Sequence, residues 1–162
     1  MEDQRLIQQH LHMNPSCLQP QTVEAIHEGV FRRIRSMIQP KACYTNAFLV
    51  GISLEAKAVV YGSAVVFGGL PIEHAWLRMA DGRLVDPTFQ RLAEQGIDHS
   101  DARYFALVEV PLGNYAELTK QPRTGELEPR DVFWFRTQRE YEELFQAPSV
   151  HQPHPPLLQQ AS

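Results

Sequence analysis

Residues 73–88 read EHAWLRMADGRLVDPT, in which two short runs rich in apolar residues flank a turn at 80–82. This pattern, with a glycine in the turn, is typical of a β-hairpin, and we expect strands over 73–79 and 83–88. Side chains alternate between the two faces of a strand. His74 and Trp76 therefore share one face of the predicted sheet.

The length of the turn decides whether Asp86 can reach His74. A two-residue turn sets Asp86 opposite Leu77, on the face away from His74. A three-residue turn over 80–82 sets it opposite Trp76, diagonal to His74 and within reach of the ring. Three-residue hairpins commonly end in a glycine in the left-handed region, and a glycine ends this one. An Asp86–His74 contact thus requires an odd-numbered turn or a bulge that restores the parity.

A cysteine upstream completes a set of three reactive residue types. Cys43 lies in KACYTNA, residues 41–47, where we expect a helix to begin. A helix N-terminus favours a thiolate, and its unpaired backbone N–H groups can bind an oxyanion. Cys43, His74 and Asp86 together suggest a nucleophile, its general base and an orienting carboxylate.

The remaining pattern predicts helices packed on one antiparallel sheet, an α+β fold. Expected helices cover 21–39, 43–54, 114–120 and 137–145, and expected strands cover 57–67, 73–79, 83–88 and 104–111. Ala47, Phe48 and Ile52 are the expected buried positions of the second helix. Residues 89–102 read as a polar loop with at most one helical turn. Residues 1–20 predict an arm or short helix, 21–146 a single domain, and 147–162 a disordered tail rich in Pro, Gln and His.

The composition narrows the class of protein. A chain of 162 residues with 43% hydrophobic and 21% charged residues is ordinary for one globular domain. The net charge of −4 gives no reason to expect nucleic acid or anionic membrane as a partner. The sequence shows no signal peptide or membrane span, so we expect a soluble, cytoplasmic protein. Only two cysteines occur, which favours a reducing compartment and leaves a Cys17–Cys43 disulfide as a minor alternative.

The helix-start cysteine, His-Ala-Trp at 74–76 and Val-Asp-Pro-Thr at 85–88 resemble the transglutaminase-like branch of the papain-like thiol enzymes. The resemblance covers about residues 39–90. It implies a cysteine-bearing helix packed on an antiparallel sheet, with Cys43 as nucleophile, His74 as general base, Asp86 as orienter and Trp76 packed nearby. The cysteine-to-histidine interval is short, and the cysteine lacks a neighbouring tryptophan, so we do not infer protein cross-linking from the resemblance. We infer thiol acyl chemistry from it.

Other residues are candidates for supporting roles. Gln39 and Tyr61 are candidates for a second oxyanion donor, and Asn46 for binding substrate or tying its helix to the sheet. The VFWF run at 132–135 reads as core or a buried strand, with a groove wall as the alternative. Cys43, His74 and Asp86 are a possible set of metal ligands, but the sequence has no Cys-x-x-Cys or His-x-x-x-His pair typical of zinc sites. We therefore predict neither metal nor cofactor.

The sequence thus predicts a cysteine-dependent hydrolase, deamidase or acyltransferase acting on an amide or ester. The substrate could be a peptide, a protein or a small molecule, and the oligomeric state stays open. A different class also fits: an inactive fold that serves as a binding or assembly module. In that case Cys43 is a small buried hydrophobe, His74 is structural, and Asp86 caps the turn that Pro87 enforces.

Overall fold

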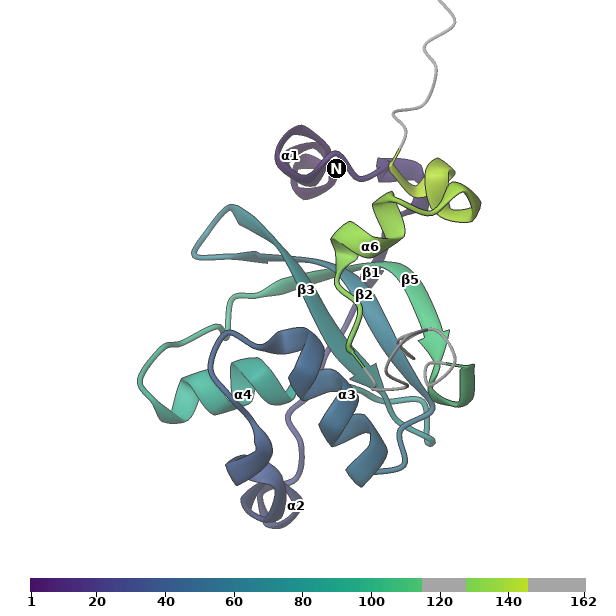
Figure 1. Ribbon diagram of the computed structural model, residues 1–162. Coiled ribbons are helices and arrows are strands. Elements are labelled where there is room, and N and C mark those ends of the chain that lie inside the picture. The colour runs from purple at the N-terminus through teal and green to yellow at the C-terminus, as the bar shows by residue number, and fades with distance from the viewer. Residues whose placement is uncertain (115–127, 146–162) are drawn as a thin grey trace, which may run out of the picture.

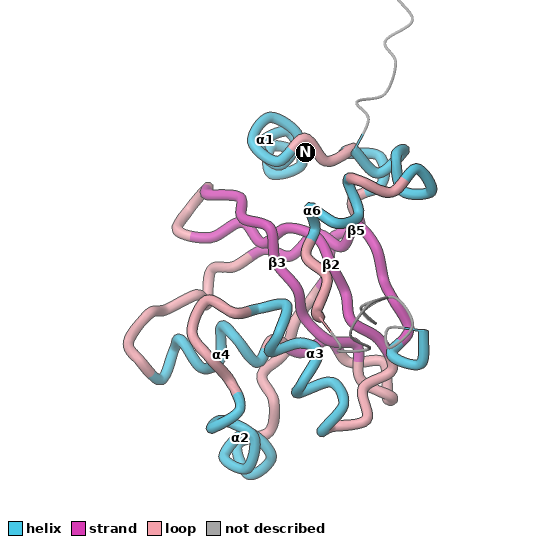
Figure 2. The backbone as a smooth tube through the Cα atoms, in the orientation of Figure 1, coloured by secondary structure: helices cyan, strands magenta, loops and turns pink. Residues whose placement is uncertain are grey.

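The computed structural model describes residues 1–114 and 128–145, with a sheet of five strands at its centre (Figures 1 and 2). The described elements are α1 (Glu2–Leu11), β1 (Gln19–Gln21), α2 (Glu28–Ile34), α3 (Cys43–Ser53), β2 (Ala58–Val66), β3 (Leu70–Arg78), β4 (Leu84–Val85), α4 (Pro87–Glu94), β5 (Arg103–Pro111) and α6 (Val132–Arg136), with 3₁₀ helices at Pro15–Cys17, Arg35–Met37 and Arg139–Phe145. The α+β class is as expected. The expected helix over 114–120 and the expected tail fall almost entirely outside the described residues.

The sheet is antiparallel and curls into a half-barrel with the strand order β1-β5-β2-β3-β4. A simple meander would have set β5 beside β4. Instead, residues 86–102 carry the chain back from the edge strand β4, and β5 pairs with β2. A single parallel bridge between Glu24 and Val85 joins the segment after β1 to β4. This bridge brings the two ends of the curled sheet together.

The two faces of the sheet bury different side chains, as the alternation of the strands predicts. One face carries Ala75 and Leu77, in a core cluster that also contains residues of α1, α2, α3 and α6. The other face carries Trp76, in a smaller cluster with Phe89 and Leu92 of α4. His74 lies on this second face, where its ring stacks on Phe89.

The β3–β4 turn has the odd-numbered geometry that an Asp86–His74 contact requires. Leu77 pairs with Val85 and Arg78 with Leu84, which sets Asp86 opposite Trp76. Met79 N–H donates to the carbonyl of Arg83, and Gly82 adopts φ +90° at the end of the three-residue loop. The predicted three-residue turn over 80–82 is confirmed.

The segment after β4 differs from the sequence expectation. The expected strand over 83–88 ends at Val85, and the expected polar loop begins instead with helix α4. Asp86 is the N-cap residue of α4 and Pro87 occupies its first turn, which is the preferred start of a helix. Aspartate followed by proline was therefore a helix start rather than a strand end.

The expected helix over 21–39 is wrong at both ends, because α2 covers only Glu28–Ile34 and is followed by the 3₁₀ helix Arg35–Met37. Residues 19–21 pair with β5, and the helix α2 begins only at Glu28, after an N-cap at His27. Between β1 and α2, backbone groups form hydrogen bonds to residues far away in the sequence. Glu24 N–H donates to the carbonyl of Leu84. The side chain of Gln90 bonds both the N–H and the carbonyl of Ile26. Tertiary hydrogen bonds here replace the helix that the periodicity favoured.

The two ends of the described chain pack against the same core. Ile7 of α1 is fully buried. The VFWF run forms α6 rather than a strand, with Val132 and Phe135 buried and Phe133 65% exposed. The expected helix over 137–145 is a 3₁₀ helix, Arg139–Phe145. In α3, Ala47 and Phe48 are buried as expected, but Ile52 is 51% exposed.

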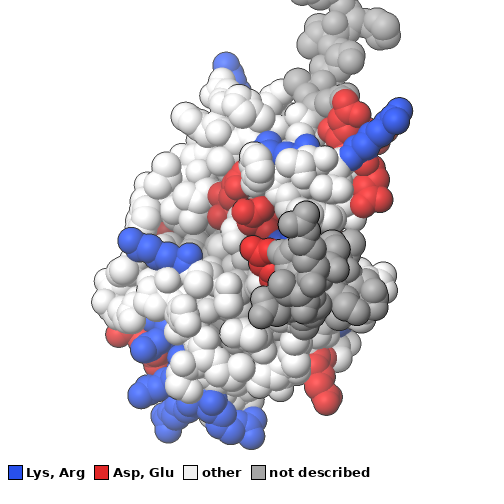
Figure 3. All heavy atoms as spheres, viewed as in Figure 1, with Lys and Arg blue, Asp and Glu red and all other residues white. Residues whose placement is uncertain are grey.

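Among the described residues, the side chains of Lys, Arg, Glu and Asp lie outside the buried core, with Asp86 as the exception. Lys and Arg gather over α2 at the bottom of Figure 3. There Arg32 pairs with Glu28, and Arg35 lies 3.7 Å from Glu94 of α4. None of the helices within residues 1–114 and 128–145 has the length and apolar character needed to cross a bilayer.

Candidate active site

Asn46 fixes the N-terminal turn of α3, where Cys43 is the first residue. Its side-chain oxygen accepts from Gln39 N–H at 2.9 Å, and its side-chain nitrogen donates to the Gln39 carbonyl at 2.7 Å. The same nitrogen lies 3.0 Å from the Thr88 hydroxyl on α4. Asn46 is fully buried and so is its bond to Thr88, whereas Gln39 is exposed. Asn46 sets the helix start, and with it Cys43, against α4.

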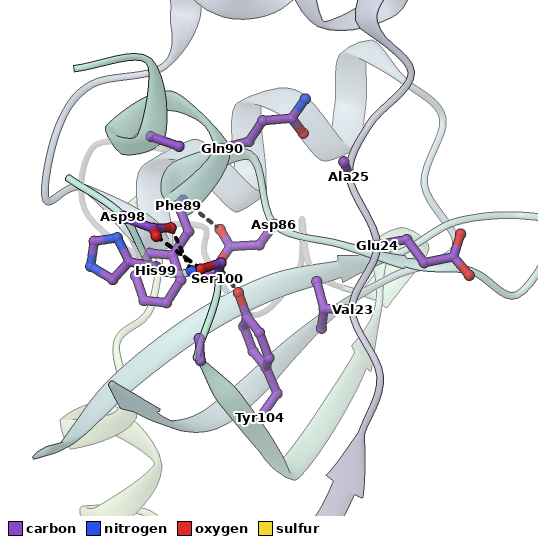
Figure 4. Close-up of a pocket in the computed structure, with 12 residues that line it drawn as sticks. Val23, Glu24, Ala25, Asp86, Phe89, Gln90, Asp98, His99, Ser100 and Tyr104 are labelled. Atoms are coloured by element: carbon purple, nitrogen blue, oxygen red, sulfur yellow. Dashed lines mark hydrogen bonds between the residues drawn. The ribbon is translucent and has the colours of Figure 1, made fainter. Parts of the chain in front are cut away.

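Asp86 holds the ring of His74. Oδ2 of Asp86 lies 2.7 Å from Nε2 of His74, and each side chain is 3% exposed. The same oxygen accepts a hydrogen bond from the Tyr104 hydroxyl at 2.9 Å, and Tyr104 points toward it in Figure 4. The other oxygen accepts from the backbone N–H groups of Thr88 and Phe89. Four donors therefore fix this buried carboxylate in one position.

Cys43 lies near His74: both residues line one cavity, and the thiol adds, after Asp86, to raising the pKa of His74. Asp86 occupies Nε2, which leaves Nδ1 as the ring nitrogen available to a second partner. The structure brings together the three residues that the sequence singled out.

The charges around His74 favour its protonated form. Burial by itself would lower the pKa of His74, but the negative charge and hydrogen bond of Asp86, with a smaller effect from Cys43, raise it to about 10. Burial, followed by the charge of Asp86, raises the pKa of Tyr104 and keeps its hydroxyl a donor. An imidazolium beside a sulfur stabilises the thiolate, the nucleophilic form of cysteine.

Two further rings support His74. Phe89 stacks on the His74 ring with centroids 4.2 Å apart, and His99 stacks on the other side of Phe89 at 4.0 Å. A cation over an aromatic face is attracted by the ring, so Phe89 also favours imidazolium. The stack fixes the plane of the His74 ring while Asp86 fixes its rotation.

A cavity of about 300 Å³ lies beside the thiol and imidazole. The surface that lines it is mostly apolar, although five of its eleven residues besides Cys43 have polar side chains. The lining residues are Lys41, Cys43, Phe67, Ile72, Glu73, His74, Thr88, Phe89, Leu92, Ile97 and His99. Cys43 and His74 therefore line a space that a small molecule could fill.

A second hollow of about 290 Å³ lies on the Asp86 side of the stack (Figure 4). Phe89 and His99 line both hollows, so this pair of rings forms a wall between them. The second hollow has a more polar lining, including Glu24, Gln90 and Asp98.

The four supporting residues suggested by the sequence do not line the cavity beside Cys43. Tyr61 is fully buried on the opposite face of the sheet, where it packs on Phe135 and Tyr44. Gln39 contributes its backbone to the tie with Asn46. Trp76 is buried beside His74 and Tyr104, in line with the packing role that the resemblance implies. The candidate oxyanion donor that remains is the backbone N–H of Cys43, which has no acceptor within its helix.

Sequence reasoning missed Tyr104 and Phe89. Tyr104 was placed only as the start of a strand, and no local pattern links it to a carboxylate 18 positions earlier. Phe89 was detectable, because Asp-Pro signals a helix start and the spacing of Phe89 and Leu92 suits one helix face.

Both cysteines are free, so the disulfide alternative is wrong. The described residues contain no cluster of three His, Cys, Asp or Glu side chains suited to a metal ion.

Comparisons with protein-family models, curated proteins and solved structures found no match to this chain. A proposal for its function therefore rests on the geometry of the site.

Proposed function

We propose that this protein is a thiol enzyme for acyl chemistry, with Cys43 as nucleophile, His74 as general acid–base and Asp86 as the residue that orients His74. The observation that carries the proposal is a single imidazole that is bonded to a buried carboxylate and shares a cavity with a thiol at a helix start. The cavity beside the thiol and the resemblance of 39–90 to transglutaminase-like enzymes support it.

The first half-reaction follows from the charges. The Cys43 thiolate attacks the acyl carbon of an amide or ester, and a carbon–sulfur bond forms. The carbonyl oxygen becomes negative, and the N–H groups at the start of α3 can stabilise it. As the intermediate collapses, the bond to the leaving group breaks and the His74 imidazolium donates its proton to the departing amine or alcohol. A thioester on Cys43 remains.

The second half-reaction regenerates the thiol. His74, now neutral, accepts a proton from an incoming water or amine, which attacks the thioester carbon. The carbon–sulfur bond breaks, Cys43 leaves as thiolate, and His74 is again imidazolium. Water as the acceptor gives hydrolysis, or deamidation of a primary amide, and an amine gives acyl transfer. Asp86 holds the ring in place throughout.

Iodoacetamide labelling at pH 6 tests the proposal by comparing the reaction rates of the two thiols. Cys17 is an internal control, because Cys17 and Cys43 are both free and partly buried. We expect Cys43 to react at least about tenfold faster, since the imidazolium near it favours the anionic, nucleophilic form of the sulfur. His74→Gln should remove the difference while the protein stays folded. Equal, slow labelling of both thiols would favour a non-catalytic binding module instead.

A further inference from the structure

The cavity beside Cys43 has a chemistry of its own. Phe67, Ile72, Phe89, Leu92 and Ile97 form most of its wall. Phe67 is 62% exposed and Ile97 41% exposed. Large apolar side chains left in water beside a reactive group commonly mark a surface that receives an apolar ligand.

The charged groups of the cavity leave its apolar part undisturbed. The carboxylate of Glu73 is bound by the Arg136 guanidinium at 2.6 Å, so its charge is balanced. Lys41 is exposed. His99 is stacked on Phe89. Beside the apolar side chains, a polar or charged chain would lose its hydrogen bonds to water without replacing them, whereas an apolar chain has no such hydrogen bonds to lose.

We infer that this cavity selects the acyl part of the substrate, and that the preferred acyl group is an uncharged aliphatic chain. The inference rests on the proposed function, because it requires Cys43 to attack the carbonyl at one end of that chain. The volume of about 300 Å³ equals about ten water-sized groups, which suits a chain of medium length rather than an acetyl group.

A series of p-nitrophenyl esters from acetyl to octanoyl tests the inference. In each turnover the Cys43 sulfur bonds the acyl carbon as the bond to p-nitrophenolate breaks, and water then releases the carboxylic acid. We expect kcat/KM, corrected for the uncatalysed rate, to rise by up to about fourfold per methylene until the cavity is filled. Cys43→Ser provides the background rate for every ester.

Substitutions at Ile72, a half-buried residue of the cavity wall, should move the preference in opposite directions. Ile72→Phe narrows the cavity and should shift the best substrate to a shorter chain, and Ile72→Ala should shift it to a longer one. Ile52→Ala is the matched control, since Ile52 is exposed on α3 and does not line this cavity. Thermal melts of all three variants verify that they are folded.

The possible results distinguish a failure of the acyl-chain preference from a failure of the proposed thiol chemistry. Cys43-dependent turnover that rises with chain length and responds to Ile72 supports both. Cys43-dependent turnover that is equal for all chains, or unaffected at Ile72, overturns the inference and leaves the proposed function standing. Turnover that is the same in wild type and Cys43→Ser for every ester, with no acylated Cys43, overturns both.

Discussion

Oδ2 of Asp86 lies 2.7 Å from Nε2 of His74, while the other oxygen of the same carboxylate caps helix α4. The sequence offered these as alternatives: Asp86 as an orienting residue, or Asp86 as a cap. In the structure one side chain does both. The cap fixes the carboxylate on a rigid element, and the carboxylate then fixes the ring. Substitutions at this position and at its partners distinguish the orientation of His74 from the capping of α4.

Asp86→Asn should remove a pH dependence of stability without removing the cap, because asparagine is an equally good N-cap residue. In the folded protein the pKa of His74 is raised to about 10, whereas an unfolded histidine titrates near 6.5. The stabilisation is therefore complete below about pH 6.5 and is lost as pH rises toward 10. Between these values the folded state holds the extra proton.

Urea unfolding at pH 6.5, 8 and 9.5, in a Cys43→Ser background so that no thiol titrates at this position, measures this effect. With Asp86 present, the free energy of unfolding should fall by at most about 1.4 kcal/mol per pH unit across this window. In the Asp86→Asn variant the slope should be much smaller. Parallel slopes for the two proteins would mean that Asp86 does not set the charge of His74.

Tyr104→Phe isolates the second donor to Asp86. The substitution keeps the ring that packs on Trp76 and removes the hydroxyl 2.9 Å from Oδ2. A buried hydrogen bond to a charged group contributes about 1.5–3 kcal/mol, so we expect a stability loss of that size. As a positioning residue, Tyr104 should also affect the labelling rate of Cys43 at pH 6, and by less than Asp86→Asn does. A stability loss with an unchanged labelling rate would limit Tyr104 to packing.

Asn46→Ala tests whether this residue is structural. It would leave the N–H and carbonyl of Gln39 without their present partners, at a cost of about 2–4 kcal/mol. Chemical denaturation measures the loss. KM for a small ester should stay within about twofold of wild type wherever the variant is folded, since Asn46 does not line the cavity. A raised KM at unchanged stability would instead assign Asn46 to substrate binding.

Gly62 lies directly across from His74 in the β2–β3 pair, at an irregularity in the pairing of β2 with β5. A Cβ atom there would lie 2.0 Å from the carbonyl oxygen of Phe105, so Gly62→Ala must push β5 away. We expect a loss of at least about 2 kcal/mol. Gly69→Ala, where no atom lies within 4 Å of the new Cβ, is the control and should change stability by less than about 0.5 kcal/mol. Similar melting temperatures for the two variants would contradict the close approach of β2 and β5.

Local rules predicted the parts of the site that lie close together in sequence. Strand alternation and the parity of the turn were enough to set Asp86 on the face of His74, because both depend only on residues 74–86. The start of α3 at Cys43 was likewise readable. What these rules could not supply is the distance from Cys43 to His74, which depends on how α3 packs against the sheet.

The errors have a common physical cause. Val23 and Ile26 share the periodicity of α2, but their segment forms hydrogen bonds to Leu84 and Gln90, more than 50 positions away. Tyr104 reaches Asp86 only because β5 returns across the sheet to pair with β2. Both features arise from long-range pairing, which local periodicity does not encode.

The most direct test of the central claim is intact-protein mass spectrometry after rapid acid quenching of the protein mixed with p-nitrophenyl hexanoate. We predict a transient mass increase of one hexanoyl group, located on Cys43 by peptide mapping, that decays as turnover completes and is absent in Cys43→Ser. His74→Gln should form the adduct far more slowly. An unmodified Cys43 in the wild type, or equal acylation of Cys17 and Cys43, would contradict the account.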